Sequence, residues 1–188
     1  VQTLLKKVSA LEIKTICPLH GPVLNDNLGY YLGLYNTWSS YMPESDGVFI
    51  AYCSVYGNTE KAALALAEKL KEKGCKKVVT SDLARSDNAE NVEDAFRYSK
   101  LVLASPTYNA DVFPFMRTFI ESLTERGYKN RTIGIIENGS WAPVAGKVMG
   151  TMFDKSKNIT FAETVVTVKS ALNSESINAI ETLAEKLK

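Results

Sequence analysis

Five short apolar runs alternate with five segments of helical spacing between Gly47 and the end of the chain. The runs, such as 101–104 and 133–136, are continuously apolar, which is typical of parallel strands covered on both faces. An α/β fold is therefore predicted, with a doubly wound five-stranded parallel sheet, order 2-1-3-4-5, and helices on both faces. The expected strands are 48–53, 77–81, 101–105, 131–136 and 164–168, and the expected helices are about 59–73, 88–97, 113–126, 144–154 and 174–187.

Length and charge narrow the class of protein. The 188 residues, 45% of them hydrophobic, suffice for one full domain and an appendage. The net charge is +1 without a basic run, so no nucleic-acid partner is expected. No apolar stretch approaches the roughly 20 residues of a membrane helix, and residues 1–10 lack the apolar segment of a signal peptide. A cytoplasmic protein without membrane attachment is predicted.

Cys17, Cys53 and Cys75 are odd in number and widely spaced, with no CxxC pair. This pattern indicates neither a disulfide framework nor a zinc site. Buried or inert thiols are expected.

Residues 1–44 are expected to form a tail and linker that precede the sheet domain, 45–188. Residues 1–11 suit a helix, 13–17 a short strand, and Pro18 to Pro22 a rigid turn. A helix over 27–42 would carry an apolar face made of Leu28, Tyr31, Leu32, Tyr35 and Trp38. Because such a face needs a packing partner, this helix either docks on the following domain or belongs to a domain outside this sequence.

The loop 54–59, with the sequence Ser-Val-Tyr-Gly-Asn-Thr, lies between the first strand and the first helix of the sheet domain. Backbone N–H groups and the helix dipole converge at such a point, which favours an anion. Ser54, Asn58 and Thr59 add neutral donors, and Gly57 permits a positive φ. The loop lacks the lysine of GxxxxGK[ST], and GxGxxG is absent, so a terminal phosphate monoester is the expected ligand.

Two further loops, 105–111 and 137–143, follow the third and fourth strands, where ligands bind in sheets of this order. Each presents an aromatic residue, Tyr108 or Trp141, together with free backbone groups. A phosphate site beside two such loops suits a phosphorylated planar heterocycle, and flavin mononucleotide (FMN) is predicted. Asp111 and Glu137 are interpreted as solvated or capping residues.

The pattern Ser54-x-x-Gly57-Asn58-Thr59 resembles the phosphate loop of flavodoxins, which implies a flavodoxin-like fold. The His20-Gly21-Pro22 turn, the aromatic helix and a following flavodoxin domain together resemble flavodiiron proteins, also called A-type flavoproteins. In that family a metallo-β-lactamase-like domain with a diiron centre precedes the flavodoxin domain. Its HxExD-type ligand cluster is absent here, so the chain resembles a carboxyl-terminal piece: residues 1–44 would be the tail and linker helix of the upstream domain.

The resemblance also implies roles for individual residues. His20 would be the last iron ligand, active only with the upstream domain, and the diiron centre would exist only in the intact protein. No residue of this chain would be catalytic. The residues expected to bind FMN are Ser54, Val55, Tyr56, Gly57, Asn58 and Thr59 at the phosphate, and Pro106, Thr107, Tyr108, Asn109, Ala110, Asn138, Gly139, Ser140 and Trp141 around the ring.

The implied function is that of an FMN-binding electron-transfer domain in a flavodiiron-type oxidoreductase. Electrons would pass from a reductant to a diiron centre that reduces O2, NO or both. The resemblance implies a redox partner, either rubredoxin-like or a flavin reductase, and a homodimer in the intact protein. The sequence identifies neither the electron donor nor the terminal acceptor.

Other readings share the same sheet. A phosphoacceptor receiver domain would need acidic residues where this chain has Cys53-Ser54 and Ser105-Pro106, so that class is excluded. A stand-alone flavodoxin-like electron carrier and an FMN-dependent NAD(P)H:quinone reductase would use the same loops, although the residues before Gly47 disfavour the reductase. A docking module that has lost its flavin is a further alternative.

Overall fold

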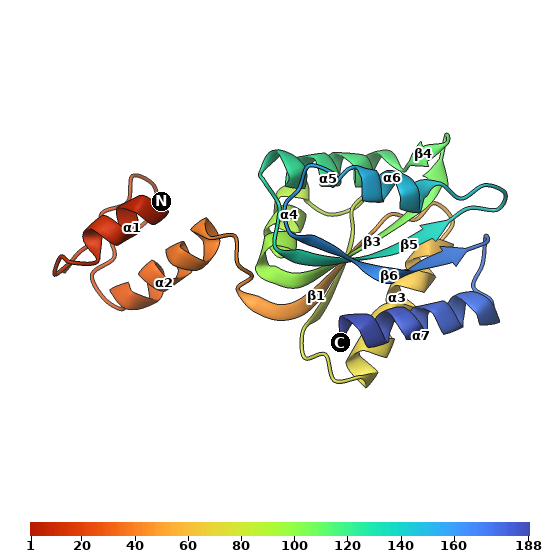
Figure 1. The fold of residues 1–188 in the computed structure, drawn as a ribbon, viewed down its shortest axis with the longest axis horizontal. Helices are drawn as coiled ribbons and strands as arrows, with labels where there is room; N and C mark the ends of the chain where they lie inside the picture. The colour runs from red at the N-terminus through yellow and green to blue at the C-terminus, as the bar shows by residue number, and fades with distance from the viewer. The chain divides into compact units, whose positions relative to one another are not determined.

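The computed structural model describes residues 1–188 and divides into two compact units, Val1–Glu44 and Ser45–Lys188. The larger unit holds the sheet (Figure 1). Its parallel strands are β1 (Ser45–Tyr52), β2 (Val78–Asp82), β3 (Tyr98–Tyr108), β5 (Arg131–Asn138) and β6 (Ile159–Val168), in the order β2-β1-β3-β5-β6. Numbered among the parallel strands alone, this is the predicted order 2-1-3-4-5, and the predicted fold class is confirmed.

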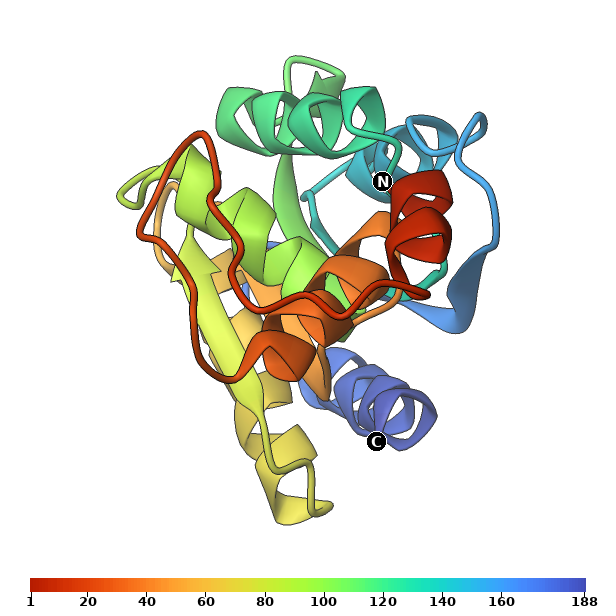
Figure 2. The same ribbon diagram turned by 90° about the vertical axis from the view of Figure 1, so that its left-hand side faces the viewer.

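Helices cover both faces of the sheet, as Figures 1 and 2 show. One face carries α4 (Asn88–Arg97), α5 (Pro114–Glu125) and α6 (Ala145–Thr151), and the other carries α3 (Asn58–Glu72) and α7 (Ser174–Leu187). Successive strand residues point to opposite faces, so Phe49 enters the α5 side of the core and Ile50 the α3 side. Both side chains are fully buried.

A short hairpin that the sequence analysis did not predict extends β3. Strand β4 (Asp111–Val112) pairs antiparallel with the end of β3, so part of the expected loop 105–111 is strand. Asn109 and Ala110 both have left-handed φ, at 52° and 57°, as in a two-residue type I′ turn. Glycine is usual at the second of these positions, and because alanine stands there the hairpin signal is missing.

Strand β6 begins at Ile159, five residues before the expected start at 164. It is the last strand in the sheet order, and its first three residues are only partly buried or exposed. The first half of an edge strand therefore lacks the continuous apolar run that marks the other strands.

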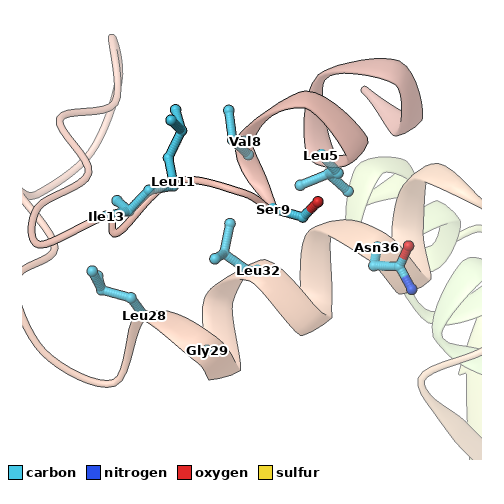
Figure 3. A pocket seen from close by; sticks show the side chains of 9 residues that line it. All are labelled: Leu5, Val8, Ser9, Leu11, Ile13, Leu28, Gly29, Leu32 and Asn36. Atoms are coloured by element: carbon cyan, nitrogen blue, oxygen red, sulfur yellow. The ribbon is translucent and has the colours of Figure 1, made fainter.

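The smaller unit consists of α1 (Gln2–Val8), α2 (Leu28–Ser39) and an irregular connection between them. A pocket of about 390 Å³ lies between the helices, lined mainly by apolar side chains such as Leu5, Leu11 and Leu32 (Figure 3). The strand expected at 13–17 is reduced to one bridge, between Ile16 and Leu24. No residue of either helix is buried, so this unit has no closed core.

The apolar face predicted for the helix 27–42 is present on α2, where Leu28, Tyr31 and Leu32 are partly buried and the two residues nearest its end are open. Tyr35 and Trp38 are both exposed and meet edge to face, with ring centroids 5.6 Å apart. The indole nitrogen of Trp38 donates to the Glu44 carboxylate at 2.6 Å. Large exposed aromatic side chains on a small unit are typical of an interaction surface.

The cysteines differ in their surroundings. Cys53 is buried and Cys75 is partly buried, but Cys17 is exposed, so of the two expected alternatives, buried or inert, burial does not hold for Cys17. Cys17 lies in the irregular connection of the small unit, where there is too little apolar surface to cover it.

The helices of both units are short or carry many polar residues. None is long and apolar enough to cross a lipid bilayer.

The stability of the sheet domain is expected to fall at alkaline pH. Burial, with the nearby Glu60 and Asp82 carboxylates, raises the pKa of Tyr52 to about 12 from its usual 10. The unfolded chain therefore loses this proton first, so the stabilisation is complete below about pH 10 and is lost as pH rises toward 12. Tyr52→Phe should show a shallower decline than the wild type in the free energy of unfolding over this range, measured by urea denaturation. Identical slopes would contradict the assignment.

Candidate cofactor-binding site

A cavity of about 590 Å³ opens at the carboxyl ends of β1, β3, β5 and β6. The arrowheads of β5 and β6 in Figure 1 mark this edge of the sheet. Thirteen of the fifteen residues predicted to bind the cofactor line the cavity, although they come from three separate loops. The lining residues are Ser54, Val55, Tyr56, Asn58, Thr59, Pro106, Thr107, Tyr108, Ala110, Asn138, Gly139, Ser140, Trp141, Ala142 and Ser170.

Two predicted residues, Gly57 and Asn109, do not line the cavity. Gly57 shapes the first loop instead: it is the N-cap of α3 and has φ of 82°, a conformation that a side chain would strain. Asn109 lies in the hairpin turn between β3 and β4.

The N-terminus of α3 is open toward a ligand. No side chain caps it, so its first backbone N–H groups lack an acceptor within the protein. Glu60 lies in this first turn, and its carboxylate accepts the Tyr52 hydroxyl at 3.3 Å. Open N–H groups and the helix dipole make this end of the cavity suited to an anion.

Ser54 carries the strongest sign of a missing ligand. Its Oγ atom is buried and has no hydrogen-bond partner, and no other buried side-chain nitrogen or oxygen in the structure is left in this state. A buried polar atom without a partner costs about 1–3 kcal/mol, so such an atom calls for a partner from outside the chain. Thr59 lies in the same loop, where its hydroxyl is 3.4 Å from the Asn138 amide nitrogen and keeps its own proton to donate.

Thr107 and Glu137 hold the wall formed by α6. The Thr107 hydroxyl accepts the backbone N–H groups of Val144 and Ala145, at 3.0 and 3.2 Å. The Glu137 carboxylate accepts the Gly146 N–H at 2.8 Å and the Thr167 hydroxyl at 3.0 Å. The sequence analysis interpreted Glu137 as a solvated or a capping residue. It caps α6, and it is buried rather than solvated because its oxygens accept these hydrogen bonds.

Gly139 permits the close approach of two of the loops. A Cβ atom at this position would lie 3.0 Å from the Pro143 backbone and 3.3 Å from the Thr107 hydroxyl. Its N–H donates to the Val168 carbonyl at 3.0 Å, which ties the loop after β5 to the end of β6.

Three aromatic side chains line the cavity and are largely exposed. Trp141 is 97% exposed, Tyr56 90% and Tyr108 51%. Tyr108 is supported from one side by Phe113, whose ring meets it edge to face at 5.3 Å. Open aromatic faces beside a cavity are suited to stacking against a planar ring. Asp111, nearby on β4, is partly exposed and pairs with Arg117 at 2.5 Å.

Ser170 is a lining residue that the sequence analysis missed. It follows β6, and its hydroxyl lies 2.6 Å from that of Ser140. The signal was present in the strand order, since the loop after the fifth parallel strand must end at the same edge as the others.

His20 lies in the smaller unit and is exposed. The structure brings together no group of three or more His, Cys, Asp and Glu side chains that could hold a metal ion. A ligand role for His20 would therefore require residues from outside this chain.

The hydrogen-bond donors and aromatic side chains that line the cavity fit FMN. An unpaired buried hydroxyl and an open helix N-terminus suit a phosphate at one end, while open aromatic faces suit a planar ring at the other. Such a site, in a doubly wound parallel sheet, defines a nucleotide- or flavin-binding α/β domain.

Comparison with known families identifies that domain. Residues 49–178 match the family of the flavodoxin domain, and the chain belongs to this family. Membership supports the binding of FMN.

Individual relatives extend the match to both units. The chain is 27% identical over 177 residues to a nitric oxide reductase of Moorella thermoacetica, which covers 94% of this chain and 44% of that protein. Rubredoxin oxygen:oxidoreductase from Desulfovibrio gigas superposes with a TM-score of 0.89 at 21% identity, covering 99% of this chain and 46% of that one. The predicted resemblance to the flavodoxin-like part of flavodiiron proteins is confirmed. The chain spans less than half the length of these two proteins.

A smaller solved structure has the same fold over part of this chain. Flavodoxin 1 from Bacillus cereus has a TM-score of 0.66 at 16% identity, covering 76% of this chain and 97% of that one. Nearly all of that flavodoxin aligns with this chain, whereas about a quarter of this chain has no counterpart in it.

Thr107 is expected to stabilise α6 even without a ligand. Thr107→Val keeps the shape of the side chain but removes the acceptor for two N–H groups at the helix start. The free energy of unfolding should fall by about 0.5–2 kcal/mol, the usual cost of losing a helix cap, in urea denaturation without cofactor. Thr107→Ser retains the hydroxyl and serves as the control. Equal stability of the valine variant and the wild type would argue against this capping role.

Proposed function

We propose that Ser45–Lys188 is an FMN-binding electron-transfer domain. The single observation that carries this proposal is the unpaired, buried Ser54 hydroxyl at the open N-terminus of α3. It lies in the same cavity as the exposed faces of Tyr108 and Trp141. Membership of the flavodoxin domain family supports the same assignment.

The residues of the chain would bind and orient the cofactor. Ser54, Thr59 and the N–H groups of α3 would hold the phosphate with neutral donors. Tyr108 and Trp141 would flank the ring and shield it from water. Bound FMN supplies the capacity to take up and release electrons, and the protein supplies binding, orientation and electrostatics.

We further propose that this domain works in a longer flavodiiron-type oxidoreductase. The smaller unit would be the tail and linker helix of an upstream metallo-β-lactamase-like domain, whose diiron centre would receive the electrons and reduce O2, NO or both. The names of the longer relatives and the open aromatic face of α2 support this arrangement. A rubredoxin-like protein or a flavin reductase would supply the electrons, and the intact protein would be a homodimer.

A stand-alone flavodoxin-like carrier is the second candidate. The flavodoxin structure that is covered to 97% covers only 76% of this chain, which weighs against it. An FMN-dependent NAD(P)H:quinone reductase would use the same cavity, and NAD(P)H oxidation by the purified chain with a quinone would identify that function.

Ser54→Ala should separate ligand binding from stability. Loss of one hydrogen bond to a charged phosphate corresponds to about 1.5–3 kcal/mol, or roughly 10- to 150-fold weaker FMN binding. Riboflavin lacks the phosphate and should bind the wild type about 100-fold or more weakly than FMN, and its affinity should not change in the variant. Fluorescence titration measures these dissociation constants.

Two further comparisons make this test specific. Thr182→Ala removes an exposed hydroxyl on α7 and should leave FMN affinity unchanged. Without cofactor, Ser54→Ala should not destabilise the protein, since it removes a buried hydroxyl that has no partner. Equal affinity of the wild type for FMN and riboflavin would refute the phosphate assignment.

The proposal for the longer protein predicts that His20 affects iron and not flavin. In the full-length protein, His20→Ala should lower iron content and the turnover of O2 or NO while leaving the flavin content unchanged, because one ligand of a metal shell is lost. In the 188-residue chain the same substitution should leave FMN binding unchanged. Stoichiometric iron, or catalytic NO consumption, in the isolated 188 residues would overturn the two-centre arrangement.

A further inference from the structure

Glu60 places a negative charge beside a site that is suited to an anion. It is the third residue of α3, after Asn58 and Thr59, which both line the cavity. A glutamate at this position often folds back and accepts the backbone N–H of the N-cap residue, here Gly57. The helix dipole also attracts its carboxylate. Glu60 is therefore an internal competitor for the N–H groups that would hold a phosphate.

The Glu60 carboxylate does not cap α3 in this structure. No side-chain hydrogen bond closes the start of the helix, although the carboxylate is close by: a Cβ atom at Gly57 would lie 3.9 Å from Glu60 Oε2. The other oxygen, Oε1, accepts the Tyr52 hydroxyl at 3.3 Å. The carboxylate is thus bound to a side chain outside the loop while the N–H groups stay open.

Tyr52 is well placed to hold this carboxylate. It is the last residue of β1, which lies between β2 and β3 in the sheet, and its side chain is buried. Burial, with the Glu60 and Asp82 carboxylates, raises the pKa of Tyr52 to about 12, so its hydroxyl remains a donor at neutral pH. Asp82 and Arg85 also lie near Tyr52, but they pair with each other at 2.6 Å. Tyr52 is therefore the hydrogen-bond partner of Glu60 in this group.

We propose that Tyr52 is a positioning residue for the phosphate site, because its hydroxyl holds the Glu60 carboxylate away from the open N–H groups of α3. Without this bond the carboxylate would turn to Gly57, accept its N–H and bring a negative charge to the place of the phosphate. Neither Tyr52 nor Glu60 lines the cavity, so the effect is indirect. This inference rests on the proposed function, because it takes the phosphate of FMN as the anion.

Tyr52→Phe removes the hydroxyl and keeps the ring. FMN should bind about 2- to 30-fold more weakly to this variant, the range implied by the strength of a helix-capping carboxylate. Riboflavin affinity should not change, since riboflavin has no phosphate to compete with the carboxylate. Fluorescence titration of the purified chain measures both. Tyr128→Phe is the matched control: it also removes a buried tyrosine hydroxyl, which donates to the Ala95 carbonyl at 3.1 Å, but Tyr128 does not line the cavity.

Glu60→Ala tests whether Tyr52 acts through the carboxylate. Once the carboxylate is gone there is nothing to hold back, so adding Tyr52→Phe to Glu60→Ala should leave FMN affinity unchanged. Glu60→Ala alone should bind FMN at least as tightly as the wild type, because a negative charge beside the phosphate is removed. An equal loss of FMN affinity from Tyr52→Phe with and without Glu60 would overturn the proposal.

The other outcomes also decide the question. Unchanged FMN affinity in Tyr52→Phe would overturn the proposal and leave the phosphate assignment intact. An equal loss for FMN and riboflavin would show that Tyr52 supports the domain as a whole, and would overturn it too. Weaker FMN binding by Glu60→Ala, which does not depend on the folding of the tyrosine variant, would have the same result. Equal affinity of the wild type for FMN and riboflavin would refute the proposed phosphate site itself, and this inference with it.

Discussion

The parallel direction of five strands buried on both faces is the constraint on which this protein depends. Helices pack on each face of the sheet, so its polar chemistry is confined to the ends of the strands. Because the strands are parallel, the loops after β1, β3, β5 and β6 lie at one edge of the sheet. Residues as far apart in the chain as Ser54 and Ser170 therefore line one cavity.

Hydrogen bonding distinguishes the residues that build this cavity from those that await a ligand. Thr107 and Glu137 use their side-chain oxygens on backbone N–H groups of α6, and Asn138 uses its amide on the backbone of Ser170. The Ser54 hydroxyl is buried without any partner, and the start of α3 has no cap. An anion-binding site needs free donors that are held in place by residues whose own hydrogen bonds are complete. If those surrounding residues could move, the free donors would find partners within the protein instead.

The smaller unit, Val1–Glu44, has no such buried core. It contains two short helices and one β-bridge, and no residue of either helix is buried. A unit of 44 residues is near the size below which a single hydrophobic core no longer stabilises a fold. Its Tyr35 and Trp38 side chains are exposed, as is typical of an interaction surface.

The sequence by itself determined the fold class, the strand order and most of the cavity, because apolar runs, helical spacing and the loop chemistry at 54–59 are local patterns. It did not reveal the β3–β4 hairpin, whose turn uses Ala110 in place of glycine, or the early start of the edge strand β6. The burial of Glu137, the unpaired state of the Ser54 hydroxyl and the place of Ser170 were decided by tertiary structure alone. Each depends on which atoms from distant segments come within hydrogen-bonding distance, and no local pattern encodes that distance.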